Sequence, residues 1–158
     1  MEKQNKNSIR RTEQVKVYKT MSLMELQTIK PKWAYGRNIN KLLNTMLHPA
    51  NQDYEIFFVK PSDLIKCSEF YEVNTEILFT GENLNDCRIT GILFQWENKR
   101  FVDPPSMYLS EDSQGKLFFN DGRHRTKLAY LLGHKRMPIA IHNDNVSEIS
   151  DLIQLSKA

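Results

Sequence analysis

Cysteine is scarce in this chain, and long apolar runs are missing from it. Its two cysteines, Cys67 and Cys87, make neither a disulfide framework nor a CxxC pair for metal binding or redox chemistry. No uninterrupted apolar run approaches the roughly 18 residues of a bilayer span, and the basic N-terminus lacks the apolar segment of a secretory signal. We therefore expect a soluble, cytoplasmic protein that makes no membrane contacts.

The length and composition leave room for one domain with a modest core. The chain has 158 residues, whereas a single domain usually takes roughly 100 to 200. Forty per cent of the residues are hydrophobic, slightly below the roughly 45 to 50% apolar content of an average globular protein. No segment repeats at a fixed period. We expect a single α+β domain with a small mixed sheet and short helices.

Positive charge is concentrated near the N-terminus. Residues 1–41 hold ten Lys or Arg against three Asp or Glu, a net +7, whereas residues 42–158 hold twelve against sixteen, a net −4. Residues 1–11 have too little apolar content to offset the entropy of ordering, so we expect residues 1–20 to form a flexible basic arm. Such an arm can follow a nucleic-acid backbone, although a solvated helix surface explains the charges equally well. The candidate nucleic-acid contacts are Arg10, Arg11, Lys16 and Lys19.

The first half of the chain gives mostly weak secondary-structure signals. Residues 15–29 carry apolar side chains at irregular intervals, and Ser22 can cap a short helical turn within them. Residues 37–47 have helical apolar spacing that stops at Pro49, which predicts a short amphipathic helix. Residues 54–59 are rich in aromatic and β-branched side chains and predict a buried strand.

The middle of the chain is predicted to contribute strands. Residues 73–79 and 89–96 have strand-like composition and lie on either side of the turn-rich residues 81–86. The Asp-Pro-Pro sequence at 103–105 then forces an extended or turning backbone, which continues over residues 107–109.

The strongest pattern lies in the last third of the chain and predicts a compact strand, loop, helix and strand. Residues 116–119 form the first strand, and the helix contains the apolar residues 128–132. Gly133 suits the left-handed position that ends such a helix. Residues 137–141 form the second strand, and residues 146–155 predict a final short helix.

The loop before that helix, residues 121–126, carries an unusual set of charges. Cations are disfavoured in the first turn of a helix, where unpaired N–H groups already create a partial positive charge. Arg123 and Arg125 therefore indicate that an anion, such as a phosphate, binds among them. Gly122 would let the backbone approach the ligand, and Thr126 can donate a further hydrogen bond. The predicted phosphate-binding residues are Gly122, Arg123, His124, Arg125 and Thr126.

Asp121 has several roles open to it. It can cap the helix, orient an Arg or His side chain, or hold Mg²⁺. A purely structural explanation of the loop is also open, in which Asp121 caps the helix, Arg123 and Arg125 project into solvent, and His124 is partly buried. The remaining histidines are scattered and show no metal-ligand spacing. They are His48, His134 and His142.

Residues 118–125, followed by an apolar helix, Gly133 and a Met-Pro-Ile strand, resemble the nucleotide-binding core of the ParB/sulfiredoxin superfamily. Within it, the chain is similar to the plasmid fertility inhibition factors, in which F-x-x-G-R-H-R precedes a helix and a G…P-[IV] strand. The resemblance covers residues 116–141. It implies a ParB N-terminal-like core at 89–141 within a nucleotide-binding domain of residues 21–158.

The resemblance implies a nucleotide-binding protein, an NTPase or a nuclease, that interferes with conjugative DNA transfer. Its cofactor would be ATP or another nucleotide, with Mg²⁺ as an optional companion, and its partner would be DNA or a conjugation protein. His124 and Arg125 would hold phosphates, and Arg123 would stabilise developing negative charge. Asp121 would position water or Mg²⁺. The implied catalytic residues are thus Asp121, Arg123 and His124.

Other branches of the superfamily suggest alternatives. Sulfiredoxin has its catalytic cysteine at the position of Arg123, which cannot act as a nucleophile, so sulfinic acid repair is not expected. Free-serine kinases carry D-G-H-H-R, which residues 121–125 approach, so a small-molecule phosphotransferase stays open. The third alternative is a non-enzymatic module that binds DNA or protein. The segment after Ile141 is too short for the additional domains of a complete partition clamp.

Overall fold

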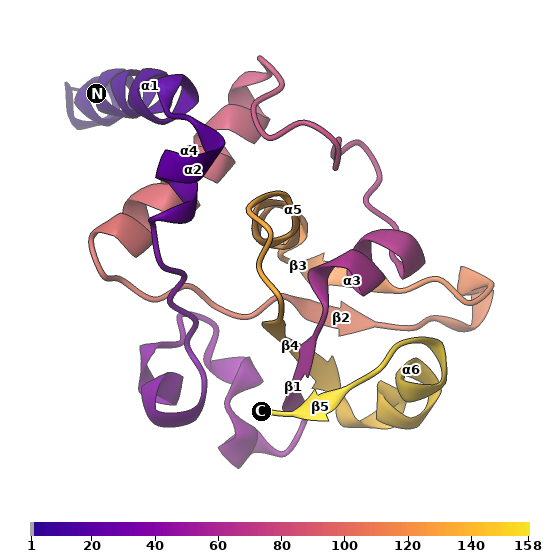
Figure 1. Ribbon diagram of the computed structural model, residues 1–158. Helices are drawn as coiled ribbons and strands as arrows, with labels where there is room; N and C mark the ends of the chain where they lie inside the picture. Colours follow the sequence, from indigo (N-terminus) through magenta and orange to yellow (C-terminus); the bar gives the residue numbers. More distant parts are fainter. Residues whose placement is uncertain (1) are drawn as a thin grey trace.

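A five-stranded mixed sheet forms the centre of the fold (Figure 1). The structure is a computed structural model that describes residues 2–158, with side chains described for residues 10–112 and 114–158. The strand order is β3, β2, β4, β1, β5; the β2–β4 pair is parallel and the other pairs are antiparallel. The expected α+β class with a small mixed sheet is therefore confirmed. The strands are β1 (Tyr54–Val59), β2 (Ser106–Tyr108), β3 (Phe118–Asp121), β4 (Met137–His142) and β5 (Ser156–Lys157).

The two central strands agree with the sequence prediction. β1 has the predicted bounds, and β4 covers the predicted residues 137–141 and adds His142. All of β4 up to Ile141 is buried, because both faces of the sheet are covered. Ile139 and Ile141 belong to the larger core, on the side of the helices. Ala140 belongs to a smaller core on the opposite face, which includes Leu42 and Leu47.

The helices form layers on one side of this sheet. α5 packs against α3 and α4, and α1 packs along α4. The buried side chains of these helices join those of the sheet in one core, which includes Leu64, Leu93 and Leu128. The helices are α1 (Glu2–Thr20), α2 (Leu23–Gln27), α3 (Pro61–Cys67), α4 (Asn83–Glu97), α5 (Arg123–Leu131) and α6 (Val146–Leu152).

Three local predictions are confirmed. Ser22 caps α2 through a capping box in which its hydroxyl accepts from the Glu25 N–H and the Glu25 carboxylate accepts from the Ser22 N–H. Gly133 follows Leu132, the C-cap residue of α5, and has a φ of 76°, in the left-handed conformation expected there. The final helix forms as α6.

The predicted strand over residues 89–96 is wrong, because these residues belong to α4. Ile89, Leu93 and Trp96 are all buried, and their spacing of four and three residues is helical. The β-branched residues of this segment favour a strand locally, but the burial of one helical face outweighs that preference. Trp96 fixes the end of the helix by donating a hydrogen bond from its indole Nε1 to the Lys32 carbonyl at 3.1 Å.

The predicted helix over residues 37–47 is replaced by two 3₁₀ turns, Gly36–Lys41 and Thr45–Leu47. The chain breaks between them because the backbone N–H groups of Leu43 and Asn44 donate to the Asp103 carboxylate at 2.8 and 2.9 Å. These contacts replace the hydrogen bonds of a continuous helix. The Leu43 side chain is 87% exposed as a result.

The predicted strand over residues 73–79 is also wrong, because this segment contains no regular element. The Asn74 side chain accepts a hydrogen bond from the Glu76 N–H at 2.9 Å, which turns the chain locally. Ile77, which contributed to the strand prediction, is half exposed. The local polar turn therefore outweighs the β propensity of this sequence.

The expected flexible arm is a helix over its described residues, 2–20, and Met1 lies outside them. The second half of α1 packs on α4, where Tyr18 is buried and its hydroxyl donates to the Glu97 carboxylate at 2.9 Å. Burial raises the pKa of Tyr18, and the Glu97 hydrogen bond raises it further. The partly buried Arg11 guanidinium lies 5.9 Å from the centre of the Phe94 ring. These contacts hold the second half of α1 on α4.

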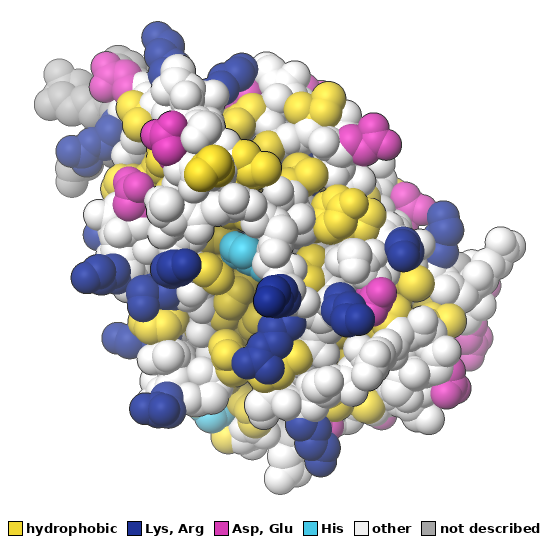
Figure 2. All heavy atoms as spheres, viewed as in Figure 1, with side chains coloured by type: hydrophobic (Ala, Val, Ile, Leu, Met, Phe, Trp, Pro, Cys, Tyr) yellow, Lys and Arg dark blue, Asp and Glu magenta, His cyan; other side chains and the backbone are white. Residues whose placement is uncertain are grey.

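Charged side chains are unevenly distributed over the surface. Figure 2 shows Lys and Arg side chains at the centre and left of one face, with most Asp and Glu toward its edges. The basic surface is thus not confined to the N-terminal helix. Among the described residues, no helix is both long enough and apolar enough to cross a membrane.

Candidate functional site

The junction between β3 and α5 positions the predicted loop. β3 ends at Asp121, Gly122 takes the N-cap position with a φ of 107°, and α5 begins at Arg123. A Cβ atom on Gly122 would lie 2.5 Å from the Pro105 Cβ and 2.7 Å from its Cα. Gly122 is therefore required for a left-handed turn and for close packing on Pro105.

No side chain caps the N-terminus of α5 within the described part of the chain, and its first turn contains no acidic residue. Asp121 lies one position before the N-cap, so the prediction that it caps the helix is wrong. The unpaired N–H groups and two arginines therefore share one helix end, as the sequence suggested.

Arg125 is held by the protein's own groups. Its Nη2 pairs with Asp121 Oδ2 at 2.6 Å, and its Nη1 donates to the main-chain carbonyl of Asp103 at 2.5 Å. The side chain is only 14% exposed. Arg125 therefore connects α5 to the extended segment before β2, and Asp121, the candidate Mg²⁺ ligand, is its ion-pair partner.

The Thr126 hydroxyl is also engaged. The residue is fully buried, and its Oγ1 donates to the Gly122 carbonyl at 3.0 Å. This bond closes the first turn of α5 together with the main-chain bond from the Thr126 N–H to the same carbonyl, also 3.0 Å. The hydroxyl that was expected to contact phosphate thus bonds within its own helix.

Arg123, in contrast, lies beside an open space. Its Nη1 donates to the Phe70 carbonyl at 3.4 Å, and its guanidinium carbon lies 5.5 Å from the centre of the Tyr71 ring. Among the described residues, no carboxylate forms an ion pair with it. Its charge is therefore stabilised by a carbonyl and an aromatic ring, both weaker partners than a carboxylate.

The start of α5 opens into a cleft of about 1320 Å³. The cleft lies between α1, α4, α5 and the segments that precede α4 and β2. Its cationic lining residues are Arg11, Arg88, Arg123 and Arg125. Its acidic lining residues are Glu72, Glu82, Asp103 and Asp121. Asp103 and Asp121 are engaged by groups of the protein itself. Among the described residues, three guanidiniums without a carboxylate partner therefore remain beside two exposed glutamates.

His124 experiences the positive charge of this cleft. Its pKa is lowered from 6.5 to about 4, mainly because the ring is partly buried and further because Arg88, Lys127 and Arg123 lie nearby. The opposing effect of Asp121 is smaller. His124 is therefore neutral at pH 7, and the potential around it favours an anion.

Only one of the four predicted arm residues reaches the cleft. Arg11 lines it, and its Nη1 is buried with no hydrogen-bond partner among the residues that the structure describes. Arg10 and Lys16 are exposed on α1, and Lys19 pairs with the Asp86 carboxylate at 3.7 Å. Arg88 is a site residue that the sequence analysis missed, because it lay just before the expected strand over residues 89–96. Arg11 was a predicted nucleic-acid contact, and only the tertiary structure places it at this cleft.

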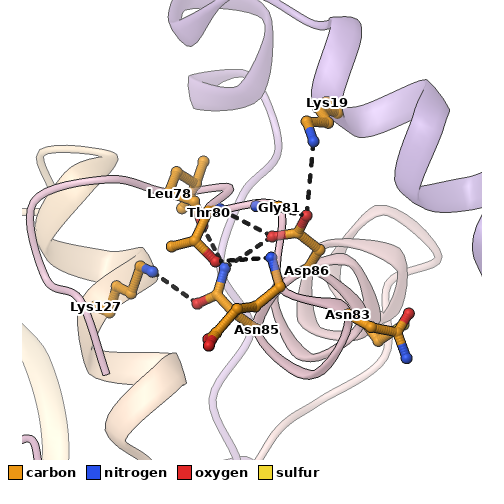
Figure 3. Close-up of polar contacts among 10 residues, drawn as sticks. Lys19, Leu78, Thr80, Gly81, Asn83, Asn85, Asp86 and Lys127 are labelled. Carbon is orange, nitrogen blue, oxygen red and sulfur yellow. Dashed lines mark hydrogen bonds and ion pairs between the residues drawn. The ribbon is translucent and has the colours of Figure 1, made fainter. Parts of the chain in front are cut away.

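A buried polar network joins α4 to α5 beside the cleft (Figure 3). Lys127 on α5 is fully buried, and its Nζ donates to Asn85 Oδ1 on α4 at 2.7 Å. Asn85 in turn donates to Asp86 Oδ1 at 2.9 Å and to the Leu78 carbonyl at 3.0 Å. Burial lowers the pKa of Lys127, and the nearby Asp86 charge partly offsets this. The network fixes α4 relative to α5 and so sets the width of the cleft between them.

The donor set does not fit a metal held by the protein alone. Across the described residues, no group of three or more His, Cys, Asp or Glu side chains could hold an ion. Asp121, the predicted Mg²⁺ ligand, is paired with Arg125. No step of a reaction is therefore assigned to a metal.

Comparisons with known protein families, with curated proteins and with solved structures find no match to this chain. The resemblance of residues 116–141 to the ParB/sulfiredoxin superfamily stays a prediction. The case for a function rests on the residues of the cleft.

Proposed function

We propose that the cleft at the start of α5 binds a nucleotide through its phosphates and that the protein is an NTPase. The observation that carries this proposal is the convergence of Arg11, Arg88 and Arg123 on one cleft. They come from three different helices, and no described carboxylate pairs with them. Like charges gathered in this way repel one another, and a polyanionic ligand removes that repulsion.

The roles of the loop residues follow from their contacts. Arg123 and Arg88 supply guanidiniums that can bind phosphate oxygens in a bidentate manner, and the first N–H groups of α5 add to the same field. Arg11 lines the same cleft and adds its positive charge to this field. Arg125 and Asp121 act as a clamp that positions the helix end and do not contact the phosphates directly.

His124 is the candidate base for hydrolysis. In the free protein its imidazole is neutral, so it can accept a proton, but a pKa of about 4 makes it a weak base. Bound phosphate would offset the charges of Arg88 and Arg123 and raise that pKa toward neutrality. His124 would then take a proton from a water molecule whose oxygen attacks the terminal phosphorus. The bond from that phosphorus to the bridging oxygen breaks, and the nucleoside diphosphate leaves.

A phosphotransferase is the second candidate, and the size of the cleft favours it. Its volume exceeds the roughly 300 to 1,000 Å³ of typical small-ligand sites, so an acceptor can enter beside the nucleotide. The same space would admit a DNA strand or a segment of a conjugation protein. Incubation with ATP and a panel of free hydroxyl amino acids separates phosphate transfer from hydrolysis, because only transfer yields a phosphorylated acceptor.

The test of the proposal is calorimetric titration with ATP. The wild-type protein should bind, and Arg123→Ala or Arg88→Ala should weaken binding at least tenfold because each removes a charge-assisted contact. The matched control is Arg37→Ala, since Arg37 is an exposed arginine away from the cleft. In parallel, NMR titration of the His124 ring should show its pKa rising from about 4 when ATP is bound.

Two results would contradict the proposal. One is the absence of ATP binding by the wild-type protein at millimolar concentration. The other is that Arg123→Ala and Arg88→Ala bind ATP with the same affinity as the control Arg37→Ala.

A further inference from the structure

Tyr71 is an aromatic residue of the cleft with an unusual backbone conformation. It lines the cleft, and its side chain is 63% exposed. Its φ is 51°, in the left-handed region that bulky side chains rarely occupy. The sequence pattern did not single out this residue.

The backbone around Tyr71 is held in this conformation by specific contacts. The Tyr71 N–H donates to Glu69 Oε1 at 3.0 Å, and the Val73 N–H donates to the Phe70 carbonyl at 3.0 Å, which closes a turn. Glu69 is itself fixed by an ion pair with Lys116 at 3.5 Å. A strained residue kept in place by its surroundings is a marker of function.

The ring of Tyr71 lies next to the cation that the proposed function assigns to phosphate. The Arg123 guanidinium carbon is 5.5 Å from its ring centre, and the Phe118 ring is 6.1 Å away in a tilted contact. The exposed phenol therefore adds a flat aromatic surface to the cleft beside Arg123. Leu84, which is also exposed, lines the same cleft.

A ligand that used the whole cleft would need an anionic part and a flat aromatic part. Inorganic phosphate has no group that gains from the Tyr71 ring, whereas a nucleobase stacks on an aromatic side chain. We infer that Tyr71 is the residue on which the base of the bound nucleotide stacks. This inference rests on the proposed function, and it makes Tyr71 the residue that distinguishes nucleotides from other phosphate compounds.

The inferred contact also predicts the breadth of specificity. Every base has a π-face, so stacking alone tolerates different bases. ATP, GTP and CTP should therefore bind more tightly than tripolyphosphate, which has the same phosphate chain without a base.

The experiment compares ATP with tripolyphosphate on variants of Tyr71 by calorimetry. Tyr71→Leu should weaken ATP binding by about tenfold or more and leave tripolyphosphate binding unchanged, whereas Tyr71→Phe should resemble the wild type. Tyr71→Asn serves as a second variant, because asparagine adopts the left-handed conformation readily. Tyr130→Leu is the control, since Tyr130 is an exposed tyrosine of α5 that does not line the cleft. Thermal unfolding of each variant verifies that it is folded.

Failure of the stacking contact and failure of the proposed function give different results in this experiment. If Arg123→Ala weakens ATP binding and Tyr71→Leu does not, the stacking contact is overturned and the phosphate site stands. If Tyr71→Leu weakens ATP and tripolyphosphate equally, Tyr71 acts by holding Arg123, and the stacking contact is again overturned. If the wild-type protein binds neither ligand, the proposed function fails and the inference fails with it.

Discussion

Arg123 and Arg125 are equivalent in the sequence pattern but not in the folded protein. Two positions apart on a helix, their side chains leave the axis about 200° apart. Arg125 is turned to the segment before β2 and to Asp121, whereas Arg123 is turned to the cleft beside Tyr71. One arginine therefore stabilises the fold, and the other stays available for a ligand.

This difference predicts that the two arginines contribute unequally to the free energy of unfolding. Arg125→Ala should lower the free energy of unfolding by about 2 kcal/mol, because it leaves the Asp103 carbonyl without its charged partner. Arg123→Ala should change it by about 0.5 kcal/mol or less, as expected for a side chain that lines an open cleft. Urea unfolding of both variants measures the two values. Equal losses would contradict the assignment of Arg125 as the structural clamp.

At the scale of elements, α4 and α5 are joined by a buried lysine. Lys127 loses its hydration on folding, and the Asn85 amide oxygen is the hydrogen-bond acceptor it gains in return. A buried ammonium without an acceptor is costly, so this bond constrains how the two helices pack. Because Arg88 and Arg123 lie on these same helices, the network also constrains the cleft.

The network predicts an asymmetry between its two ends. Asn85→Ala should lower the free energy of unfolding by about 3 kcal/mol, since Lys127 then stays buried without its partner. Lys127→Met should cost less, because it removes the charge and keeps most of the side-chain volume. Asn83→Ala is the matched control on an exposed residue of the same helix turn. Urea unfolding that gave Lys127→Met the larger loss would contradict this account.

At the scale of the whole molecule, two partly buried histidines make stability depend on pH. Burial is the main cause that lowers the pKa of His124 to about 4, and it also lowers the pKa of His134. In the unfolded chain the pKa of each histidine returns to about 6.5. Between about pH 6.5 and pH 4, the unfolded chain therefore binds protons that the folded chain does not.

It follows that the free energy of unfolding should fall as the pH drops through this range. Urea unfolding at pH 7.5 and pH 5 measures the loss for the wild type. The double variant His124→Gln, His134→Gln should lose less over the same interval, because its folded and unfolded states no longer differ in these two sites. A double variant that lost as much as the wild type would show that other groups cause the change.

The parts of the fold that could be predicted are those in which local and tertiary preferences agree. β1, β4 and the start and end of α5 combine strong propensity with clear boundary residues such as Gly122 and Gly133. Secondary-structure predictions failed where contacts with residues far away in the chain determined the local conformation. The Asp103 carboxylate breaks the chain after Leu42, and burial between α1 and α5 makes residues 89–96 helical.

The sequence by itself determined the α+β class, the central strands and a cationic helix start after β3, because these depend on periodicity, turn residues and charges that are adjacent in the chain. Only the tertiary structure decided which cations are available. It used Arg125 and Thr126 internally and brought Arg11, Arg88 and Tyr71 to the same cleft. The physical reason is that pairing and burial depend on distances between segments that are far apart in the chain.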